Sequence, residues 1–329
     1  MTSLPYDRAS AKAWAREAMH GIWCAALTPF RHEDGAIDEA AFRRNLRHWF
    51  DDLLIDGVFV SGKQGEFFSM SVAERKRTFE IAVEEAHAPG RERRGVILSC
   101  SDQNLDVVID LARHAERIGA DAIVVHAPVL HFLKAQDETL AAYYRRIADE
   151  VAIAMALWSH PDSGYLMSPR LCARLAGIET VVAIKYYVPR EMYAELTRIA
   201  GDTLIVSTAS EEEWLDNIVE LGWRLYLCSS PPYLIQTAVD RRMRQYTDLA
   251  FAGKADEARR VSESLAPVRR ALKDTRPAEK PQAHQKYWQD LLGQTGGAVR
   301  FPMLPLTQAE RAATRAAFEA CGLRLPATA

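Results

Sequence analysis

Lys185 is the residue of this chain best suited to covalent chemistry. It lies in the stretch VVAIKYYV, residues 181–188, at the carboxyl end of an apolar, β-branched run. Burial lowers the pKa of an amine and frees its lone pair to attack a carbonyl carbon. At the carboxyl end of a barrel strand, where the active sites of such barrels lie, this lysine would form a Schiff base. The alternative is a solvated lysine that simply ends a strand.

Other candidate residues stand where further strands would end. The carboxyl ends of barrel strands meet at one mouth, which brings together residues that are far apart in the chain. With Lys185 we therefore expect a site that draws on Thr28, Gly62, Lys63, Gln64, Gly65, Trp158, His160, Tyr186 and Ser229.

The elements that must position these residues are eight short apolar runs that alternate with amphipathic stretches. Near-continuous apolar runs are typical of parallel strands covered on both faces. The alternation predicts an α/β fold, a (β/α)8 TIM barrel. An open, doubly wound sheet is the alternative, but no GxGxxG or GxxxxGK[ST] follows the first run. The runs cover residues 22–29, 57–62, 95–101, 121–128, 153–161, 181–187, 203–209 and 224–230.

Helix starts support this division of the chain. Capping boxes are predicted at Ser71, Ser210 and Thr307, and Pro169 follows Ser168 at a first helical position. After Pro232 the pattern is wholly helical. We expect an N-terminal helical arm, a barrel and a C-terminal helical extension or cap, over residues 1–20, 21–250 and 251–329.

The composition excludes several classes of protein. Of the 329 residues 48% are hydrophobic, enough for a large core, while 41 basic and 44 acidic residues nearly balance. No basic block is interleaved with aromatics, so we expect no nucleic acid and no membrane partner. The five scattered cysteines lack CxxC spacing and predict reduced core thiols, no metal site and a cytoplasmic protein. No signal peptide and no membrane span is predicted.

Four motifs in order, ALTPF, SGKQGE, AIK and VRFPMLPLTQAER, resemble those of the dihydrodipicolinate synthase and N-acetylneuraminate lyase superfamily of class I aldolases. The resemblance spans residues 21–323. It implies a (β/α)8 barrel, a homo-oligomer (tetramer or dimer) and no cofactor. It also implies that Lys185 forms an imine with the keto group of pyruvate or another 2-oxo acid. Such an imine stabilises the enamine through which bonds to carbon form and break.

The sequence departs from this family where the substrate would bind. The loop after the second strand normally reads GTTGE, and here Lys63 and Gln64 replace the two threonines. Trp158 replaces the strand-five tyrosine, and an indole N–H cannot shuttle protons. Val129 and Leu130 replace a tyrosine pair after strand four. We therefore expect that the chain is not a true dihydrodipicolinate synthase.

Other groups could take over the missing roles. A water, His160 or Tyr186 could relay the proton, although His160 could equally be structural. His126 would face the mouth if the register is right, and Tyr165 could pack at the rim. Lys63 could hold the substrate carboxylate and, by like-charge repulsion, lower the pKa of Lys185, or it could point into solvent.

The local likeness is greatest to the hydratase-aldolases that cleave arylidene-pyruvates. KYY at Lys185 and CSSPP at residues 228–232 resemble motifs of that subgroup. Trp158, with Phe67 and Phe68, could form the floor of an aromatic pocket. We expect a lyase that releases or condenses pyruvate with a bulky or aromatic aldehyde. The alternatives are a dehydratase of a 2-oxo-3-deoxy sugar acid and a non-catalytic barrel that binds keto acids.

Overall fold

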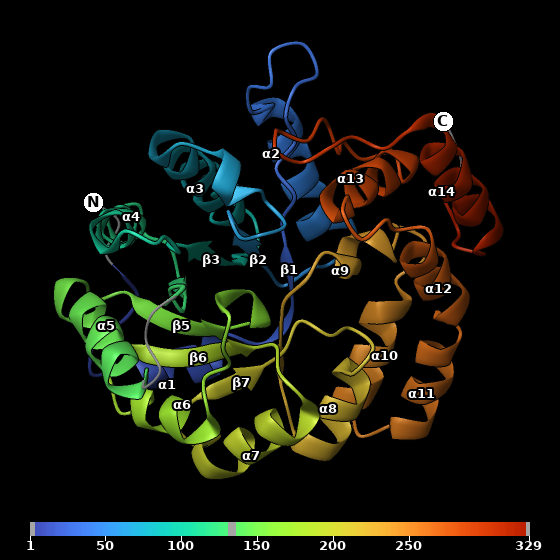
Figure 1. The fold of residues 1–329 in the computed structure, drawn as a ribbon. Helices are drawn as coiled ribbons and strands as arrows, with labels where there is room; N and C mark the ends of the chain where they lie inside the picture. Colours follow the sequence, from blue (N-terminus) through green and yellow to red (C-terminus); the bar gives the residue numbers. More distant parts are fainter. Residues whose placement is uncertain (1–3, 131–135, 327–329) are drawn as a thin grey trace.

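The computed structural model describes residues 4–130 and 136–326. The first three residues of the expected arm and the last three of the expected cap therefore lie outside the described residues. Eight parallel strands form the core of the fold (Figure 1). They are β1 (Gly21–Ala25), β2 (Gly57–Val60), β3 (Gly95–Ser99), β4 (Ala122–His126), β5 (Ala154–Ser159), β6 (Val181–Tyr186), β7 (Ile205–Ser207) and β8 (Leu225–Leu227).

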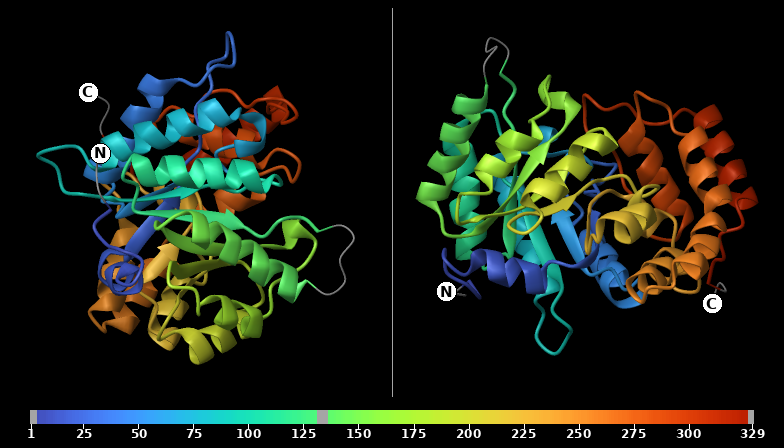
Figure 2. Two further views of the ribbon diagram at one scale, coloured as in Figure 1. Left: turned by 90° about the vertical axis from the view of Figure 1, so that its left-hand side faces the viewer. Right: turned by 90° about the horizontal axis from the view of Figure 1, so that it is seen from below.

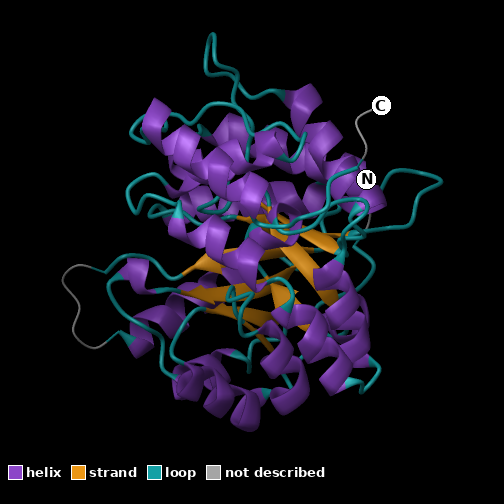
Figure 3. Ribbon diagram, turned by 90° about the vertical axis from the view of Figure 1, so that its right-hand side faces the viewer, coloured by secondary structure: helices purple, strands orange, loops and turns teal. Residues whose placement is uncertain are grey.

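Helices follow the strands and surround them (Figure 3). Helix α1 (Ala11–Ala18) precedes β1. The helices between successive strands are α2 (Glu39–Arg47), α3 (Val72–Ala86), α4 (Leu105–Arg117), α5 (Asp137–Glu150), α6 (Pro169–Leu175), α7 (Arg190–Ala200) and α8 (Trp214–Leu221). The others come after β8: α9 (Pro231–Leu234), α10 (Arg242–Phe251), α11 (Ala255–Glu263), α12 (Ala266–Asp274), α13 (Pro281–Leu291) and α14 (Gln308–Ala320).

The predicted (β/α)8 barrel is confirmed, and it closes through a side chain. The strands pair in the order β7-β6-β5-β4-β3-β2-β1-β8. Between β7 and β8, Ser207 makes the link. Its Oγ donates to the Leu225 carbonyl at 2.7 Å and accepts the Leu227 N–H at 2.8 Å. The last gap in the barrel is therefore bridged by one hydroxyl group.

Two apolar layers follow from the alternation of side chains along each strand. The layer between sheet and helices contains buried side chains such as Val58, Val125, Leu157 and Ile184. The layer inside the barrel contains Phe59, Val124, Ala156, Trp158 and Ala183. Because both faces are covered, the strands read as continuous apolar runs, as the sequence predicted.

Three of the predicted helix starts are confirmed. Capping boxes begin α3 at Ser71 and α14 at Thr307. The Ser168 side chain accepts the Leu171 N–H at 3.1 Å, and proline occupies the first turn of α6. Each side chain satisfies a backbone donor that the helix itself leaves free.

The capping box expected at Ser210 is wrong. Helix α8 begins at Trp214, and no side chain caps it. The neighbouring Glu211 turns inward instead, and its carboxylate bonds to Arg269 at 2.7 Å and to the Tyr246 hydroxyl at 2.7 Å. This buried ion pair holds residues 210–213 outside the helix.

The two ends of the chain cover different parts of the barrel. Ala11, Ala15 and Met19, from α1 and just after it, pack with the apolar layer inside the barrel, and Figure 2 shows this arm lying across one end of the strands. The C-terminal helices α11–α14 stand beside the barrel, with α13 next to α2 (Figure 1). The Asn45 side chain joins these two regions by donating to the Thr295 carbonyl at 2.7 Å.

All five cysteines are buried and unpaired, as predicted for core thiols. None of the helices in the described part of the chain combines the length and apolar character needed to cross a bilayer. Among residues 4–130 and 136–326, no group of three or more His, Cys, Asp or Glu side chains is placed to hold a metal ion.

Candidate active site at the barrel mouth

Lys185 is buried inside the barrel near the carboxyl end of β6, with 2% of its surface exposed. Its Nζ lies 4.8 Å from the ring centroid of Phe59 and 4.6 Å from that of Trp158. Its Nζ also donates to the Cys228 sulfur, at 3.9 Å. Burial lowers the pKa of the Lys185 ammonium, and the charge of Lys63 adds to this effect. The solvated alternative for Lys185 therefore does not apply.

Lys185 belongs to a row of register partners across four strands. His126 on β4 pairs with Trp158 on β5, Trp158 with Lys185 on β6, and Lys185 with Ser207 on β7. Register partners in a sheet direct their side chains to the same face. The row therefore brings an imidazole, an indole and an amine to one level of the barrel interior.

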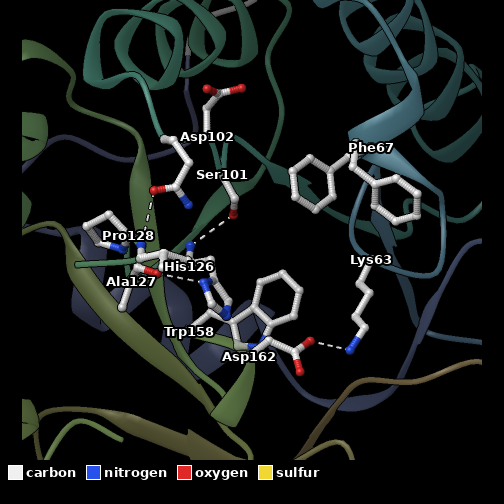
Figure 4. Close-up of a pocket in the computed structure, with 12 residues that line it drawn as sticks. Lys63, Phe67, Ser101, Asp102, His126, Ala127, Pro128, Trp158 and Asp162 are labelled. Carbon is white, nitrogen blue, oxygen red and sulfur yellow. Dashed lines mark hydrogen bonds and ion pairs between the residues drawn. The ribbon is translucent and has the colours of Figure 1, made fainter. Parts of the chain in front are cut away.

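A cavity of about 400 Å³ opens beside this row (Figure 4). Its polar lining includes Lys63, Ser101, Asp102 and Asp162, and these stand around a mainly apolar surface. A pocket of this kind suits an apolar ligand with a few polar groups that orient it. The apolar lining residues are Phe67, Phe68, Ala127, Pro128, Val129 and Trp158.

Lys63 lies at the rim of the cavity, with 42% of its side chain exposed. It forms an ion pair with Asp162, which follows β5. That Lys63 holds a substrate carboxylate stays a prediction. The neighbouring Gln64 has a buried side-chain oxygen, Oε1, without a hydrogen-bond partner among the described residues. Buried polar atoms are usually bonded, so this oxygen is available to a ligand or a water.

Gly62 and Gly65 allow the loop after β2 to approach the site closely. A Cβ on Gly62 would lie 2.1 Å from the ring of Phe59, which in turn contacts Lys185. Thr28 is buried, and its hydroxyl donates to the Gly65 carbonyl at 3.0 Å. Thr28 and the two glycines therefore shape the loop that borders the amine.

The same loop is anchored by a residue pair that the sequence did not reveal. Glu66 is fully buried at φ +57°, in the left-handed region, and pairs with Lys286 of α13 at 2.5 Å. Its other oxygen accepts the Arg300 N–H at 3.0 Å. Burial lowers the pKa of Lys286 to about 8. The glutamate of SGKQGE was visible, but nothing marked its partner 220 residues further on.

The proton relay expected from Tyr186 does not fit its position. Tyr186 follows Lys185 on β6, so its side chain leaves the opposite face of the strand. It is fully buried between sheet and helices, and its hydroxyl donates to the Met167 carbonyl.

His160 lies beyond the end of β5 and has a structural contact. Its Nδ1 accepts the Asp162 N–H at 3.1 Å, and its ring stacks on Tyr187 with centroids 5.0 Å apart. Burial lowers its pKa to about 4, so the ring is neutral at pH 7. The same Nδ1 lies 3.2 Å from Asp162 Oδ1, so Asp162 occupies this nitrogen through both its backbone and its side chain.

Two further expected residues use their hydroxyls within the protein. The Ser229 hydroxyl hydrogen bonds to that of Tyr226, and Ser229 is not among the residues that line the cavity. The Tyr165 hydroxyl donates to the Pro128 carbonyl at 2.7 Å. Tyr165 therefore supports the wall of the cavity from behind, in agreement with a rim packing role.

Arg75 is a supporting residue that sequence reasoning missed. It is buried on α3 and donates to the carbonyls of Ser99 and Ser101 at 2.8 and 3.0 Å. It also pairs with Asp102 at 3.2 Å. Arg75 therefore fixes the loop after β3 at the cavity. The sequence signal that could have indicated this role is an arginine at a buried position of an amphipathic helix.

The barrel and the buried lysine at its mouth define the class of protein, a lyase of the class I aldolase type. The family follows from comparison with known proteins. Residues 18–321 match the model of the dihydrodipicolinate synthetase family, and the chain belongs to that family. The resemblance noted in the sequence is thereby confirmed.

Relatives in this family share a quarter to a third of their residues with the chain. The 4-hydroxy-tetrahydrodipicolinate synthase of Pelobacter propionicus is 28% identical over 306 residues, and that of Acidiphilium cryptum 30% identical over 308 residues. Both matches cover 92% of this chain and 99% of the relative. The solved N-acetylneuraminate lyase of Fusobacterium nucleatum has a TM-score of 0.80 at 24% identity, covering 93% of this chain and 99% of that one.

Proposed function

We propose that the protein is a Schiff-base lyase in which Lys185 forms an imine with pyruvate or a larger 2-oxo acid. The observation that carries this proposal is the position of its Nζ. It lies inside the barrel mouth between two aromatic rings, and it forms no ion pair with a carboxylate of the described residues. A buried amine with a lowered pKa is a nucleophile for a ketone.

The loop after β2 would bind the carboxylate of the substrate. Lys63 supplies a cation at the rim, and the backbone N–H groups of Lys63 and Gln64 make no hydrogen bond within the described residues. A carboxylate placed there would accept hydrogen bonds from these two N–H groups, and it would compete with Asp162 for the ammonium of Lys63.

The aldehyde part would be bulky or aromatic. The cavity beside His126 presents the rings of Phe67, Phe68 and Trp158, which favour flat apolar groups. A polyhydroxylated sugar acid would find few hydroxyl partners there, so this lining favours aldol cleavage over dehydration of such an acid. Trp158 in place of the family's strand-five tyrosine also separates the chain from the true synthases.

Borohydride trapping tests the proposal. The protein is incubated with pyruvate, reduced, digested and analysed by mass spectrometry. We expect one reduced pyruvyl adduct, on the peptide that contains Lys185, and none in a Lys185→Met variant. Lys286 is an internal control, because it is equally buried but already paired with Glu66.

The outcomes separate the alternatives. No adduct with any 2-oxo acid would leave a binding barrel without imine chemistry. An adduct on Lys286 alone would place the reactive amine elsewhere. If trapping succeeds, a panel of hydroxy-oxo acids with detection of free aldehyde distinguishes a lyase from a dehydratase, which releases water and no aldehyde.

We also propose that the chain assembles as a homo-oligomer, a tetramer or a dimer, as the family resemblance implies. Light scattering of the purified protein measures the mass directly. A particle with the mass of a single 36.9 kDa chain would contradict this proposal.

A further inference from the structure

His126 occupies the position in the barrel from which a base could act on a Lys185 adduct. It ends β4 and is two strands from Lys185 in the same register row. Neighbouring strands lie about 4.8 Å apart, so the two Cα atoms are separated by about 10 Å. His126 also lines the cavity beside Trp158, as Figure 4 shows.

Both side chains contact the same indole. The His126 ring meets the Trp158 ring edge to face with centroids 4.7 Å apart, and Lys185 Nζ lies 4.6 Å from the Trp158 ring. An adduct on Nζ that extends along the indole therefore points toward the imidazole. Trp158 itself cannot take a proton, because an indole N–H only donates.

The hydrogen bond of the His126 ring determines which nitrogen is free. Nδ1 lies 2.7 Å from the Ala127 carbonyl oxygen, which can only accept, so Nδ1 carries the proton. Nε2 of the neutral ring then keeps its lone pair. None of the hydrogen bonds among residues 4–130 and 136–326 uses this atom. Its partner would come from a ligand or from water.

Several charges surround the ring, and their effects on its pKa oppose one another, with the Ala127 carbonyl also favouring the protonated form. Lys185 on β6 and Lys63 after β2 disfavour a second positive charge, while Asp162 after β5 favours it. His160 lies 6.5 Å away and is neutral, and Asp102 at the far wall is paired with Arg75. Burial is the largest influence and lowers the pKa of His126.

We propose that His126 Nε2 moves the proton to and from C3 of the 2-oxo acid bound to Lys185. The inference rests on the proposed function. The C3–H bond breaks, its electron pair forms the C2=C3 bond of the enamine, and the electron pair of the C=N bond moves to the nitrogen of Lys185. The proton passes to Nε2, and the reverse step returns it. No oxidant, reductant or further reactant is required.

Other groups near the amine suit this step less well. His160 is not among the residues that line the cavity and its ring stacks on Tyr187, while Tyr186 faces away from the barrel interior. Cys228 is close to Lys185, but burial raises the pKa of its thiol to about 11, so little thiolate is present at pH 7. Asp102 and Asp162 also line the cavity, but they are paired with Arg75 and Lys63, whereas His126 Nε2 has no such partner among the described residues.

Exchange of the methyl protons of pyruvate for deuterium tests the inference without knowledge of the aldehyde. In D2O, followed by proton NMR, the native protein should exchange these protons. The His126→Asn variant keeps a side-chain N–H for the Ala127 carbonyl but has no base. We expect its borohydride adduct on Lys185 to remain, while exchange slows by about 10²- to 10⁴-fold.

Three further variants sharpen the comparison. His114→Asn, on α4 outside the barrel, should exchange at the native rate. A greater loss in His160→Asn or in Cys228→Ala than in His126→Asn would overturn the assignment to His126. Exchange by His126→Asn within about threefold of the native rate would also overturn it, since general base catalysis contributes far more.

The pH profile of the native protein gives an independent readout if His126→Asn does not fold. Protonated imidazole cannot accept the C3 proton, so the rate should fall as the solution becomes acidic. Because the pKa of His126 is lowered, the midpoint should lie below about 6.5. A rate that rises as the pH falls below about 6.5 overturns the inference. If native protein gives no adduct at all, the proposed function fails first, and the inference fails with it.

Discussion

At the scale of single residues, two aromatic rings surround the amine of Lys185, and this arrangement affects its charge state. Phe59 and Trp158 attract the ammonium form weakly through their rings, whereas a carboxylate would fix the positive charge. Burial thus remains the main influence on the amine and lowers its pKa. The site keeps a lysine that can lose its proton inside the protein.

This arrangement predicts that Lys185 destabilises the fold. Because the folded-state pKa is lowered, the penalty for burying the ammonium is fully present below that pKa. Between that pKa and the ordinary value of about 10.5 the folded chain binds fewer protons than the unfolded chain, so the penalty shrinks as the pH rises and is gone above about 10.5. Lys185→Met should therefore raise the melting temperature at pH 7, by roughly 2 °C or more for each kcal/mol gained. The gain should shrink above about pH 10. Calorimetry at both pH values measures it, and a lower melting temperature at pH 7 would contradict the prediction.

A second prediction at this scale concerns Lys63. If it binds the substrate carboxylate, Lys63→Ala should raise the pyruvate concentration for half-maximal borohydride trapping by about five- to tenfold, with Lys63→Arg closer to native. Lys76→Ala removes another half-exposed lysine, one paired with Asp110 on the outer helices, and should leave trapping unchanged. Unchanged trapping in Lys63→Ala would mean that Lys63 forms its ion pair with Asp162 but does not bind the substrate.

At the scale of elements, the loop after β2 depends on a helix from the far end of the chain. Glu66 of the loop and Lys286 of α13 are both buried, and Gln282 of α13 also donates to the Lys63 carbonyl at 3.3 Å. The C-terminal helices therefore hold the loop that borders the amine of Lys185. This explains why an extension beside the barrel matters for a site at its mouth.

Breaking this pair should be costly. Lys286→Met leaves the Glu66 carboxylate buried without its cation, which should lower the free energy of unfolding by about 3–5 kcal/mol. Glu66→Gln combined with Lys286→Met should recover a large part, because no buried charge then remains unpaired. Urea unfolding measures both variants. Lys254→Met, on an exposed pair, should change stability by less than about 0.5 kcal/mol. An additive double variant would show that the two groups are not coupled.

At the scale of the whole molecule, the N-terminal arm ties together strands at the closed end of the barrel. The Tyr6 hydroxyl donates to the Asp121 carbonyl at 2.6 Å and accepts the Ala154 N–H at 2.8 Å. These residues lie at the starts of β4 and β5, so a single side chain joins the arm to both strands. The arm thus covers the amino ends of these strands and leaves their carboxyl ends, where the cavity lies, uncovered.

Tyr6→Phe should lower the free energy of unfolding by about 1–3 kcal/mol, because it leaves the buried Ala154 N–H without an acceptor. Trapping of pyruvate on Lys185, at the other end of the barrel, should not change. Tyr143→Phe is the matched control, since that hydroxyl is buried without a partner among the described residues and its loss should cost little. Equal losses in both variants would show that the Tyr6 hydrogen bonds do not stabilise the fold.

The sequence by itself determined the elements and singled out Lys185 as the candidate reactive residue. Apolar runs in Val181–Tyr186 and the other strands identify parallel strands, because burial on both faces leaves no room for polar side chains. The capping boxes at Ser71 and Thr307 are local hydrogen bonds and could be found from four adjacent residues. Lys185 was visible because it interrupts an apolar run.

Only the tertiary structure decided which residues meet at Lys185. The alignment of His126 with Trp158 and Lys185 depends on hydrogen-bond register between strands that lie about 30 residues apart, and one residue of slip would turn His126 away. The pairing of Glu66 with Lys286 depends on a helix that returns from the end of the chain. Spacing along a sequence encodes neither relation, since both arise from how separate elements pack against one another.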